Sequence, residues 1–511
     1  MDEKPIRWWP LLAIWIISAG LWCYAYGTSD ANRQDLVMKS FAIGFFAIVL
    51  SLIWLLAFSR LRWKIRFTAL AIALLSVFLF AGLFRFEGFS GDLVPVFGWR
   101  WAEETARDKK LDTELSQPVG PIDKATINDF TQFFGSNRDG KISGVSLDRD
   151  WISDPPELLW RQPIGEAWSG FAVSNSKAIT QEQDEDRELV VCYDLLTGKA
   201  LWQHSDVARY DDALGGVGPR ATPTIEGNRV YTLGATGILN CLDLRDGSLL
   251  WGLNILKEND AKLPDWGTSS SPLIYGELVV VSAGGRDGRS LVAYNKTSGD
   301  FVWGGGSEPA HWSSPVAYEI GGKEQILIFN RALTSHDPDN GNVLWSYPWK
   351  RDHPHVSIPL LLGSDRVMLS SGYGNGSALL QITANEDVSF SVERLWKTLH
   401  MKAKFTNLVS KDGYVYGLDD GIMACLDIET GRRAWKTGRY GHGQVLLLDD
   451  LLLVSAENGE ILLLEATPVE SRVLTRFQAL TGKSWNPPAL VAPFLLVRNH
   501  KEAACYKLPL N

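Results

Sequence analysis

Near the N-terminus, apolar side chains fill three long segments: Trp8–Tyr26, Phe41–Phe58 and Phe67–Phe84. None of them contains a charged residue, and each is close to the roughly 20 residues that an α-helix needs to cross a hydrocarbon core. Bulky Trp22 and Tyr24 stand where a signal peptidase site needs small residues, so the first segment is interpreted as a retained helix. We therefore predict a three-helix transmembrane region over residues 1–85, anchored in a lipid bilayer.

Basic side chains set the expected orientation of these helices. They cluster before the first apolar segment and between the second and third, at Lys4, Arg7, Arg60, Arg62, Lys64 and Arg66. Short loops rich in Lys and Arg stay on the cytoplasmic side of a membrane. We predict a multi-pass protein of the cytoplasmic (inner) membrane, with its N-terminus in the cytoplasm and the residues after the third helix in the periplasm.

Beyond residue 156, polar and apolar positions repeat. An alternating apolar strand leads to Asp, two residues, a small polar residue, Gly, three residues and Trp. Degenerate copies centre on Gln381, followed by Trp396, and on Glu465. Successive copies lie about 38–52 residues apart, which is typical of four-stranded propeller blades. The clear copies are Asp194, Gly198 and Trp202; Asp243, Gly247 and Trp251; Asn295, Gly299 and Trp303; Asp337, Gly341 and Trp345; and Asp427, Gly431 and Trp435.

Each part of this motif has a physical reason. The Asp side chain caps a tight turn by accepting backbone N–H groups two residues on, and Gly supplies the positive φ that closes the turn. The Trp then falls on the outer strand, where a large flat side chain can wedge between neighbouring sheets. We interpret the motif as structural, so its carboxylates are not expected to bind a metal.

The two ends of the repeat region complement each other. Residues Pro488–Leu508 contain inner strands without an outer one, whereas Glu157–Ile164, with Trp160, has the pattern of an outer strand without inner ones. Joining them makes an eighth blade and closes the ring, which removes exposed strand edges. After the membrane region, we predict an extracytoplasmic tether and strap over residues 86–155 and an all-β eight-bladed propeller over residues 156–511.

Composition narrows the function classes. A formal net charge of -9 gives no basic face, so nucleic acid is not an expected partner. Cys192, Cys241 and Cys425 each stand two residues before a turn Asp, and Cys505 has a similar place in the last blade. We interpret these four as small, reduced core residues of separate blades, with neither a disulfide nor a metal role.

The repeated Asp-x-x-Thr-Gly-x-x-x-Trp ending resembles the pyrroloquinoline-quinone (PQQ) repeat propellers. Residues 130–140, Phe-Thr-Gln-Phe-Phe-Gly-Ser-Asn-Arg-Asp-Gly, look like the strap that precedes the propeller in bacterial members. The resemblance covers residues 128–511 and implies an eight-bladed fold. Because the family includes both quinoprotein dehydrogenases and non-catalytic propellers such as the outer-membrane assembly factor, it leaves the function open.

A quinoprotein dehydrogenase would need PQQ and a Ca²⁺ ion held by several oxygen ligands in the funnel, with an Asp or His to accept the substrate proton. The alcohol-oxidising branch also stacks its cofactor on a disulfide between adjacent cysteines, and this chain has no adjacent cysteines. Its blades stay near the minimal length, which leaves no long loops for a deep active site. We therefore expect no catalytic residues, no cofactor and no metal.

Residues just before each inner strand commonly face the mouth of a propeller's funnel. Aromatic, basic and imidazole groups there suit an anionic or sugar-like ligand or a peptide, although each Trp alone could pack between blades. The candidate ligand-binding residues are Trp168, Arg220, Trp266, His311, Trp312, His355, Lys404 and Trp485, together with His442.

The favoured function is a non-catalytic, membrane-anchored periplasmic propeller that binds or scaffolds envelope proteins. The first alternative is a membrane-bound PQQ-dependent alcohol or aldose dehydrogenase, because membrane glucose dehydrogenases have a comparable layout of N-terminal helices. The second alternative is a ligand-sensing propeller coupled to the helices, which would need a partner chain for its output.

Overall fold

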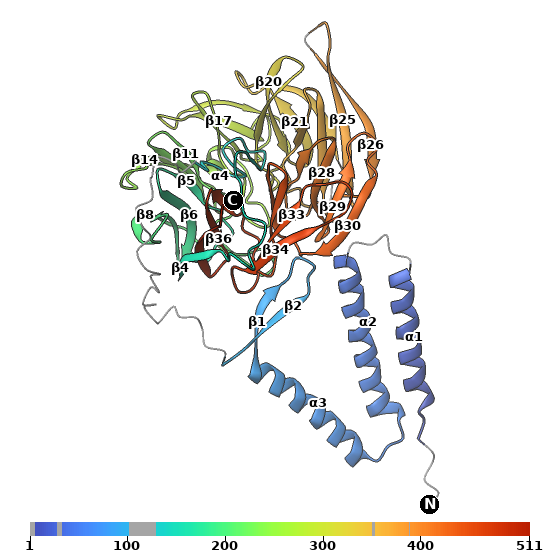
Figure 1. Cartoon of the computed structure of the whole chain (residues 1–511). Helices are drawn as coiled ribbons and strands as arrows, with labels where there is room; N and C mark the ends of the chain where they lie inside the picture. Colours follow the sequence, from blue (N-terminus) through green and yellow to red (C-terminus); the bar gives the residue numbers. More distant parts are fainter. Residues whose placement is uncertain (1–5, 28–32, 102–128, 350–352, 388) are drawn as a thin grey trace, which may run out of the picture. The chain divides into compact units, whose positions relative to one another are not determined.

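The computed structural model describes residues 6–27, 33–101, 129–349, 353–387 and 389–511. It divides into two compact units, Met1–Thr105 and Ala106–Asn511, which are described separately (Figure 1).

The first unit contains the three predicted apolar helices. They are α1 (Trp9–Gly27), α2 (Arg33–Ile53), which continues into a π-helical turn η1 (Trp54–Phe58), and α3 (Trp63–Leu83). All three spans are long and apolar enough to cross a membrane, and most of their large apolar side chains are exposed, as expected for helices that face lipid. The prediction of three spanning helices is confirmed, with α2 beginning earlier than the apolar run does.

A β-hairpin follows α3 where the sequence predicted the start of a polar tether. Strands β1 (Phe84–Phe89) and β2 (Pro95–Trp99) pair antiparallel, with Phe84 opposite Trp99. Their rings lie edge to face with centroids 5.3 Å apart, an arrangement that stabilises cross-strand pairs. The scattered Pro and Gly residues favoured a tether, but the alternating aromatic positions were the stronger signal.

The second unit forms eight antiparallel sheets, here called blades 1 to 8, arranged in a ring (Figure 1). Blades 1 to 4 are β5 (Ala172–Ser174), β6 (Lys177–Asp184), β7 (Arg187–Asp194) and β8 (Ala200–Val207); β11 (Thr224–Glu226), β12 (Arg229–Leu233), β13 (Ile238–Asp243) and β14 (Leu249–Asn254); β15 (Leu273–Tyr275), β16 (Leu278–Ser282), β17 (Leu291–Asn295) and β18 (Phe301–Gly305); and β19 (Val316–Ile320), β20 (Lys323–Phe329), β21 (Ala332–His336) and β22 (Val343–Pro348).

The remaining blades follow the same order. Blades 5 to 8 are β23 (Leu360–Leu362), β24 (Arg366–Ser371), β25 (Gly376–Ala384) and β26 (Phe390–Thr398); β27 (Val409–Lys411), β28 (Tyr414–Asp419), β29 (Ile422–Asp427) and β30 (Arg433–Arg439); β31 (Gln444–Leu448), β32 (Leu451–Ser455), β33 (Glu460–Glu465) and β34 (Val473–Gln478); and β35 (Ala489–Val491), β36 (Phe494–Arg498), β37 (Glu502–Lys507) and β4 (Glu157–Pro163). The predicted eight-bladed ring, closed by pairing β4 with β37, is confirmed.

Two faces of the ring follow from this topology. Within each blade the strands run alternately up and down from the channel outward, so the turns between third and fourth strands all lie at one end, here called the turn face. The loops that join one blade to the next lie at the opposite end, here called the mouth face. The short helix α4 (Ile255–Glu258) and the strand pair β9 (Asp211–Asp212) and β10 (Gly216–Val217) are insertions in such loops, which the sequence analysis expected to be minimal.

The repeat motif builds the turns as predicted. Asp194 Oδ1 accepts the backbone N–H groups of Leu196 and Thr197 at 3.2 and 2.9 Å. The motif glycines adopt positive φ, for example 67° at Gly198 and 74° at Gly247, a conformation that costs glycine nothing. The motif Asp residues are thus turn caps.

Six motif Trp residues join their blade to the next, whereas the Trp345 indole N–H donates to Gln325 Oε1 of its own blade at 2.7 Å. The Trp202 indole N–H donates to the carbonyl of Leu244 in blade 2 at 3.0 Å, and its ring covers the next motif glycine, Gly247. The same bond is made by Trp160, Trp251, Trp303, Trp396 and Trp435. The predicted packing of the Trp ring between neighbouring sheets is confirmed. It also explains why the motif position is glycine, because a Cβ there would collide with the ring.

We predict that Gly247→Ala lowers the free energy of unfolding by about 2 kcal/mol, because overpacking adds to the cost of a positive φ. An added Cβ at Gly247 would lie 2.4 Å from Trp202 Cε3. Gly227 is the matched control, since it also has positive φ (56°) but no heavy atom within 4 Å of an added Cβ, and Gly227→Ala should cost about 1 kcal/mol. Denaturant unfolding followed by Trp fluorescence measures both; equal losses would contradict the packing role.

The blade cysteines share one position, as predicted. Cys192, Cys241, Cys425 and Cys505 each lie opposite the motif Trp of the neighbouring strand. All four are free and buried, and burial raises the pKa of the Cys192 thiol to about 12. Buried thiols of this kind are unreactive packing residues.

A strap over residues 129–148 crosses the channel at the turn-face end. Phe130 bridges to Val173 in blade 1, and strand β3 (Lys141–Ile142) adds parallel to β31 in blade 7. Between these points Arg138, which is 3% exposed, reaches into the channel. Its guanidinium donates to the carbonyls of Ser271 and Pro315, among others in blades 3 and 4. The strap therefore occupies the turn-face end of the channel.

Candidate functional site

A ring of hydrogen bonds around the channel fixes the loops of the mouth face. Small polar residues just before the inner strands bond from each blade to the next. The links, from blade 1 around to blade 1 again, are Ser169 Oγ to Ala221 O, Ser271 Oγ to Thr222 N, Ser314 Oγ to Ser271 N, Ser313 Oγ to Ser357 O, Asn407 Oδ1 to Ile358 N, Gln444 Nε2 to Phe405 O and Trp485 O, and Asn486 Nδ2 to Ser169 O. Because these residues are buried and bonded, the side chains beside them are held rigidly.

The predicted ligand-binding residues lie in the loops of the mouth face, ahead of their inner strands. The structure sorts them into three groups with different surroundings rather than one uniform lining. Trp168, Lys404 and Trp485 belong to an aromatic and basic group, Trp266, His311, Trp312 and His355 to a packed junction, and Arg220 to an inserted loop.

The first group is here called the mouth platform and consists of Tyr373, Lys404, Phe405, Lys483, Trp485 and Trp168. The Lys404 ammonium lies 4.8 Å from the ring centroid of Tyr373 and 5.4 Å from that of Phe405. The Lys483 ammonium lies 4.1 Å from Trp485 and 4.9 Å from Trp168. The Trp485 ring contacts both neighbouring rings, with centroids 5.1 Å from Phe405 and 4.8 Å from Trp168. The platform is therefore continuous across four blades.

The second group is a packed junction between blades 3, 4 and 5. His311 and His355 face each other with ring centroids 4.6 Å apart, and Trp312 stacks near Trp266 at 4.8 Å. His355 Nδ1 bonds to a backbone carbonyl at 2.6 Å. Burial, with His355 and Arg331 nearby, lowers the pKa of His311 to about 3. This histidine is therefore neutral at physiological pH and adds no positive charge to the mouth.

Arg220 holds an inserted loop over residues 208–219. Its guanidinium donates to the carbonyls of Gly215 and Gly216, each at 2.9 Å, and lies 4.5 Å from the Tyr210 ring. Trp168 Nε1 also donates to the Gly215 carbonyl at 2.7 Å. Arg220 thus fixes the loop that borders the platform, a positioning role that its place in the sequence did not reveal.

Three platform residues escaped the sequence analysis: Tyr373, Phe405 and Lys483. Tyr373 lies in the turn between the second and third strands of blade 5, and those turns were not considered. Phe405 directly follows the predicted Lys404, and Lys483 precedes the predicted Trp485 by two residues. All three would have been found by examining every residue of each loop and turn at the mouth face, instead of only the positions just before the inner strands.

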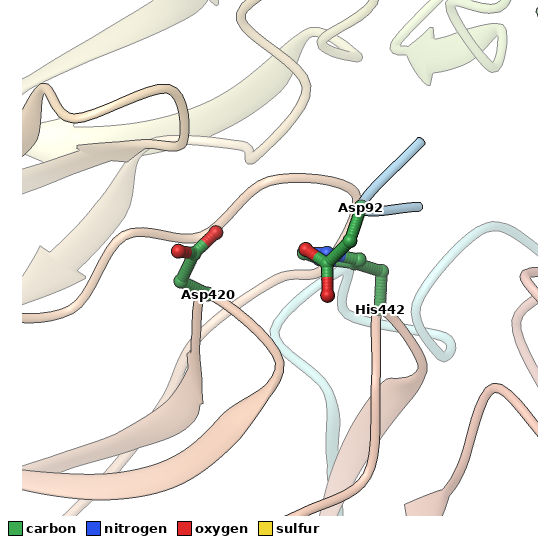
Figure 2. A group of neighbouring side chains, drawn as sticks. All are labelled: Asp92, Asp420 and His442. Carbon is green, nitrogen blue, oxygen red and sulfur yellow. The ribbon is translucent and has the colours of Figure 1, made fainter. Parts of the chain in front are cut away.

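Asp420 and His442 lie next to the platform in blades 6 and 7 (Figure 2, which also draws Asp92 of the first unit). The His442 backbone N–H donates to Glu457 Oε2 at 2.9 Å, and its ring lies edge-on to Phe405 at 5.5 Å. Among the described residues of the propeller, no three Asp, Glu, His or Cys side chains bring ligand atoms within 4.8 Å of one another. A Ca²⁺ ion takes six to eight oxygen ligands, and no group of three Asp or Glu side chains converges in this way among the described residues of the propeller.

Comparisons with known proteins agree with this fold. The family model described as outer membrane protein assembly factor BamB matches residues 154–262 and 186–437, which together span more than half of the chain. BamB from Moraxella catarrhalis is a similar solved structure, with 13% identity, 69% of this chain and 100% of that chain covered, and a TM-score of 0.49. No curated protein matches the chain.

Quinohemoprotein alcohol dehydrogenases are similar as well. The enzyme from Comamonas testosteroni is 11% identical, with 74% of this chain and 80% of that chain covered and a TM-score of 0.52. ADHIIG from Pseudomonas putida HK5 is also 11% identical, with 75% and 80% covered and a TM-score of 0.51. At such identities the likeness is one of fold alone. The match to the family model decides the membership: the chain belongs to the family of the outer membrane protein assembly factor BamB.

Proposed function

We propose that this protein is a membrane-anchored, non-catalytic binding propeller whose mouth face holds an envelope protein partner. The observation that carries the proposal is the mouth platform, where aromatic and basic side chains are fixed by the ring of hydrogen bonds around the channel. Rigid anchors of this kind lower the entropic cost of association, and aromatic residues are enriched where proteins bind each other.

The three apolar helices support a membrane anchor, and the basic loops that flank them support an orientation with the propeller on the periplasmic side of the inner membrane. Membership of the BamB family supports a protein partner, since that family is described as an outer membrane protein assembly factor. The helices then hold the propeller at the membrane of the envelope.

A catalytic role would require the funnel to hold PQQ and Ca²⁺. Among the described propeller residues no three Asp, Glu, His or Cys side chains bring ligand atoms within 4.8 Å of one another, and the His311 and His355 pair near the mouth is packed and hydrogen-bonded. No proton acceptor is placed beside a set of metal ligands, so we assign no reaction step to this funnel.

Titration of the purified full chain with PQQ and Ca²⁺ tests the proposal. We expect no change in cofactor absorbance at micromolar concentration and no reduction of dye with alcohols or aldoses. Stoichiometric cofactor binding accompanied by dye reduction would overturn the non-catalytic function and turn attention to the carboxylates of the funnel. A PQQ-dependent dehydrogenase of the same fold serves as the positive control for both readouts.

A further inference from the structure

The rim of the propeller is formed by the fourth strand of each blade, here called the outer strand. Each outer strand is the last strand of its sheet in the described part of the chain, as β14 is in blade 2 and β18 in blade 3. Such an edge presents N–H and C=O groups to which another strand can bond, and proteins protect it with charged side chains, above all lysine, or with proline. The residues of the outer strands therefore indicate which part of the rim is open to pairing.

The outer strands of blades 5 to 8 contain charged residues, whereas those of blades 2 to 4 contain none. The uncharged strands have the sequences Leu-Leu-Trp-Gly-Leu-Asn in β14, Phe-Val-Trp-Gly-Gly in β18 and Val-Leu-Trp-Ser-Tyr-Pro in β22. In blade 1, β8 contains Asp206. Protection by charge is therefore missing along three neighbouring blades. The charged residues of blades 5 to 8 are Glu393, Arg394 and Lys397; Arg433, Lys436 and Arg439; Arg476; and Glu157 and Arg161.

Two of the three uncharged strands are protected in another way. The Arg289 guanidinium lies 4.0 Å from the centroid of the Phe301 ring, at the start of β18. Strand β22 ends at Pro348, which has no N–H to donate, and Arg394 of blade 5 donates to the Tyr347 hydroxyl at 3.4 Å. In the part of the chain that the structure describes, the uncharged edge without a proline or a stacked arginine is β14.

Strand β14 exposes two large apolar side chains. Leu249 is 50% exposed and Leu250 is 47% exposed. The register between β13 and β14 shifts between Cys241 and Leu242, which places one extra residue in β14, and both leucines reach solvent. Burial of apolar surface contributes about 25 cal/mol per Å². A strand that pairs with β14 and covers the leucines is therefore favoured by more than its backbone hydrogen bonds.

A second copy of the same strand complements this edge. Two identical antiparallel strands are related by a two-fold axis, so each contact is made twice and the assembly closes at two copies. A strand without charge does not repel its copy. Exposed side chains of both signs flank β14, with Arg245 and Asp246 before it and Lys257 and Glu258 after it. Antiparallel pairing therefore brings groups of opposite sign near each other at both ends.

The three apolar helices give an additional reason for pairing between copies. They are long and apolar enough to cross a membrane, and copies anchored in one bilayer meet at a higher effective concentration than copies in solution. We infer that a second copy of this chain pairs with β14 at the rim, with the two strands antiparallel and Leu249 and Leu250 buried in the contact. The concentration argument rests on the proposed membrane anchor, whereas the pairing itself does not involve the mouth platform.

Sedimentation equilibrium of the purified full chain in detergent, at several protein concentrations, tests the inference. We expect a reversible equilibrium between monomer and dimer. Leu250→Lys and Leu249→Lys should each weaken the dimer by at least about 10-fold, because pairing would bring two added ammonium groups into the contact. A wild type that is monomeric at every concentration, or a dimer of unchanged strength in both variants, would overturn the inference and leave the proposed partner binding standing.

Ala434→Lys is the matched control. Ala434 is exposed and directly precedes the motif Trp435 in the charged outer strand β30, as Leu250 precedes Trp251 in β14. This variant should dimerise as strongly as the wild type, and an equal weakening would overturn the inference. Denaturant unfolding followed by Trp fluorescence checks that the variants are folded, as expected for substitutions at exposed positions. The titration with PQQ tests the proposed function separately.

Discussion

Replacing Arg138 by methionine is expected to lower the free energy of unfolding by about 3–5 kcal/mol. The side chain is almost fully buried in the channel, and its Nε donates to Gln132 Oε1 at 2.6 Å while Nη1 donates to the carbonyls of Pro315 and Ser271 at 2.9 and 3.2 Å. Methionine keeps the length of the side chain but leaves these acceptors without a donor in a site closed to water. Orphaned buried acceptors cost more than the average hydrogen bond contributes.

Arg149→Met is the control for this experiment. Arg149 lies in the segment that follows the strap and pairs with Asp450 at 2.5 Å, but both side chains are about half exposed, at 47% and 57%. An exposed ion pair contributes roughly 1 kcal/mol at most, so its loss should hardly shift the denaturation midpoint followed by Trp fluorescence. Equal destabilisation by the two substitutions would contradict the idea that Arg138 joins blades 2, 3 and 4 through the channel.

The parts of the fold that the sequence predicted well are those set by local, repeated pattern. Asp194, Gly198 and Trp202 stand at fixed offsets because one turn and one strand decide their roles, and the same offsets recur in other blades. The closing blade was also predictable, since β4 and the strands of Pro488–Leu508 each lacked what the other had. Apolar runs of sufficient length identified the three helices for the same reason.

The mouth was harder to predict because it depends on which loops meet across the ring. Lys483 and Lys404 lie far apart in the sequence, and only the closed ring brings Trp485 against Phe405. Arg138 is similar, since most of its acceptors lie more than 80 residues away in the sequence. Contacts of this kind have no period in the sequence, and an arginine in a Gly-rich turn gives no local sign that it will be buried.

Raising the pH from about 4 to about 8 should destabilise the propeller through Glu188, and Glu188→Gln should remove about 3 kcal/mol of that pH dependence. Glu188 is 5% exposed between blades 1 and 2. Its Oε1 accepts the Ala235 backbone N–H at 2.9 Å, whereas Oε2 has no hydrogen-bond partner within the described part of the chain. Asp206 lies directly opposite Glu188 on the paired strand, and Arg220 is also close enough to interact.

The direction of this effect, a loss of stability as the pH rises, follows from the pKa of the Glu188 carboxyl. Burial is the main cause that raises the pKa of Glu188 from 4.5 to about 7, the Ala235 N–H lowers it, and Asp206 raises it further. The folded state therefore binds more protons than the unfolded state between these two values. The stabilisation is complete below pH 4.5 and is lost as the pH rises through about 7.

Denaturant unfolding of the wild type and of Glu188→Gln at several pH values measures this loss. The glutamine variant should gain stability relative to the wild type as the pH rises, because its amide cannot ionise in the buried site. Glu319→Gln, at an exposed position in β19, is the control and should follow the wild type throughout. Burial also raises the pKa of Glu182, so the free energy of unfolding of Glu188→Gln will still change somewhat with pH. If its dependence on pH were the same as that of the wild type, Glu188 would ionise normally in the folded protein.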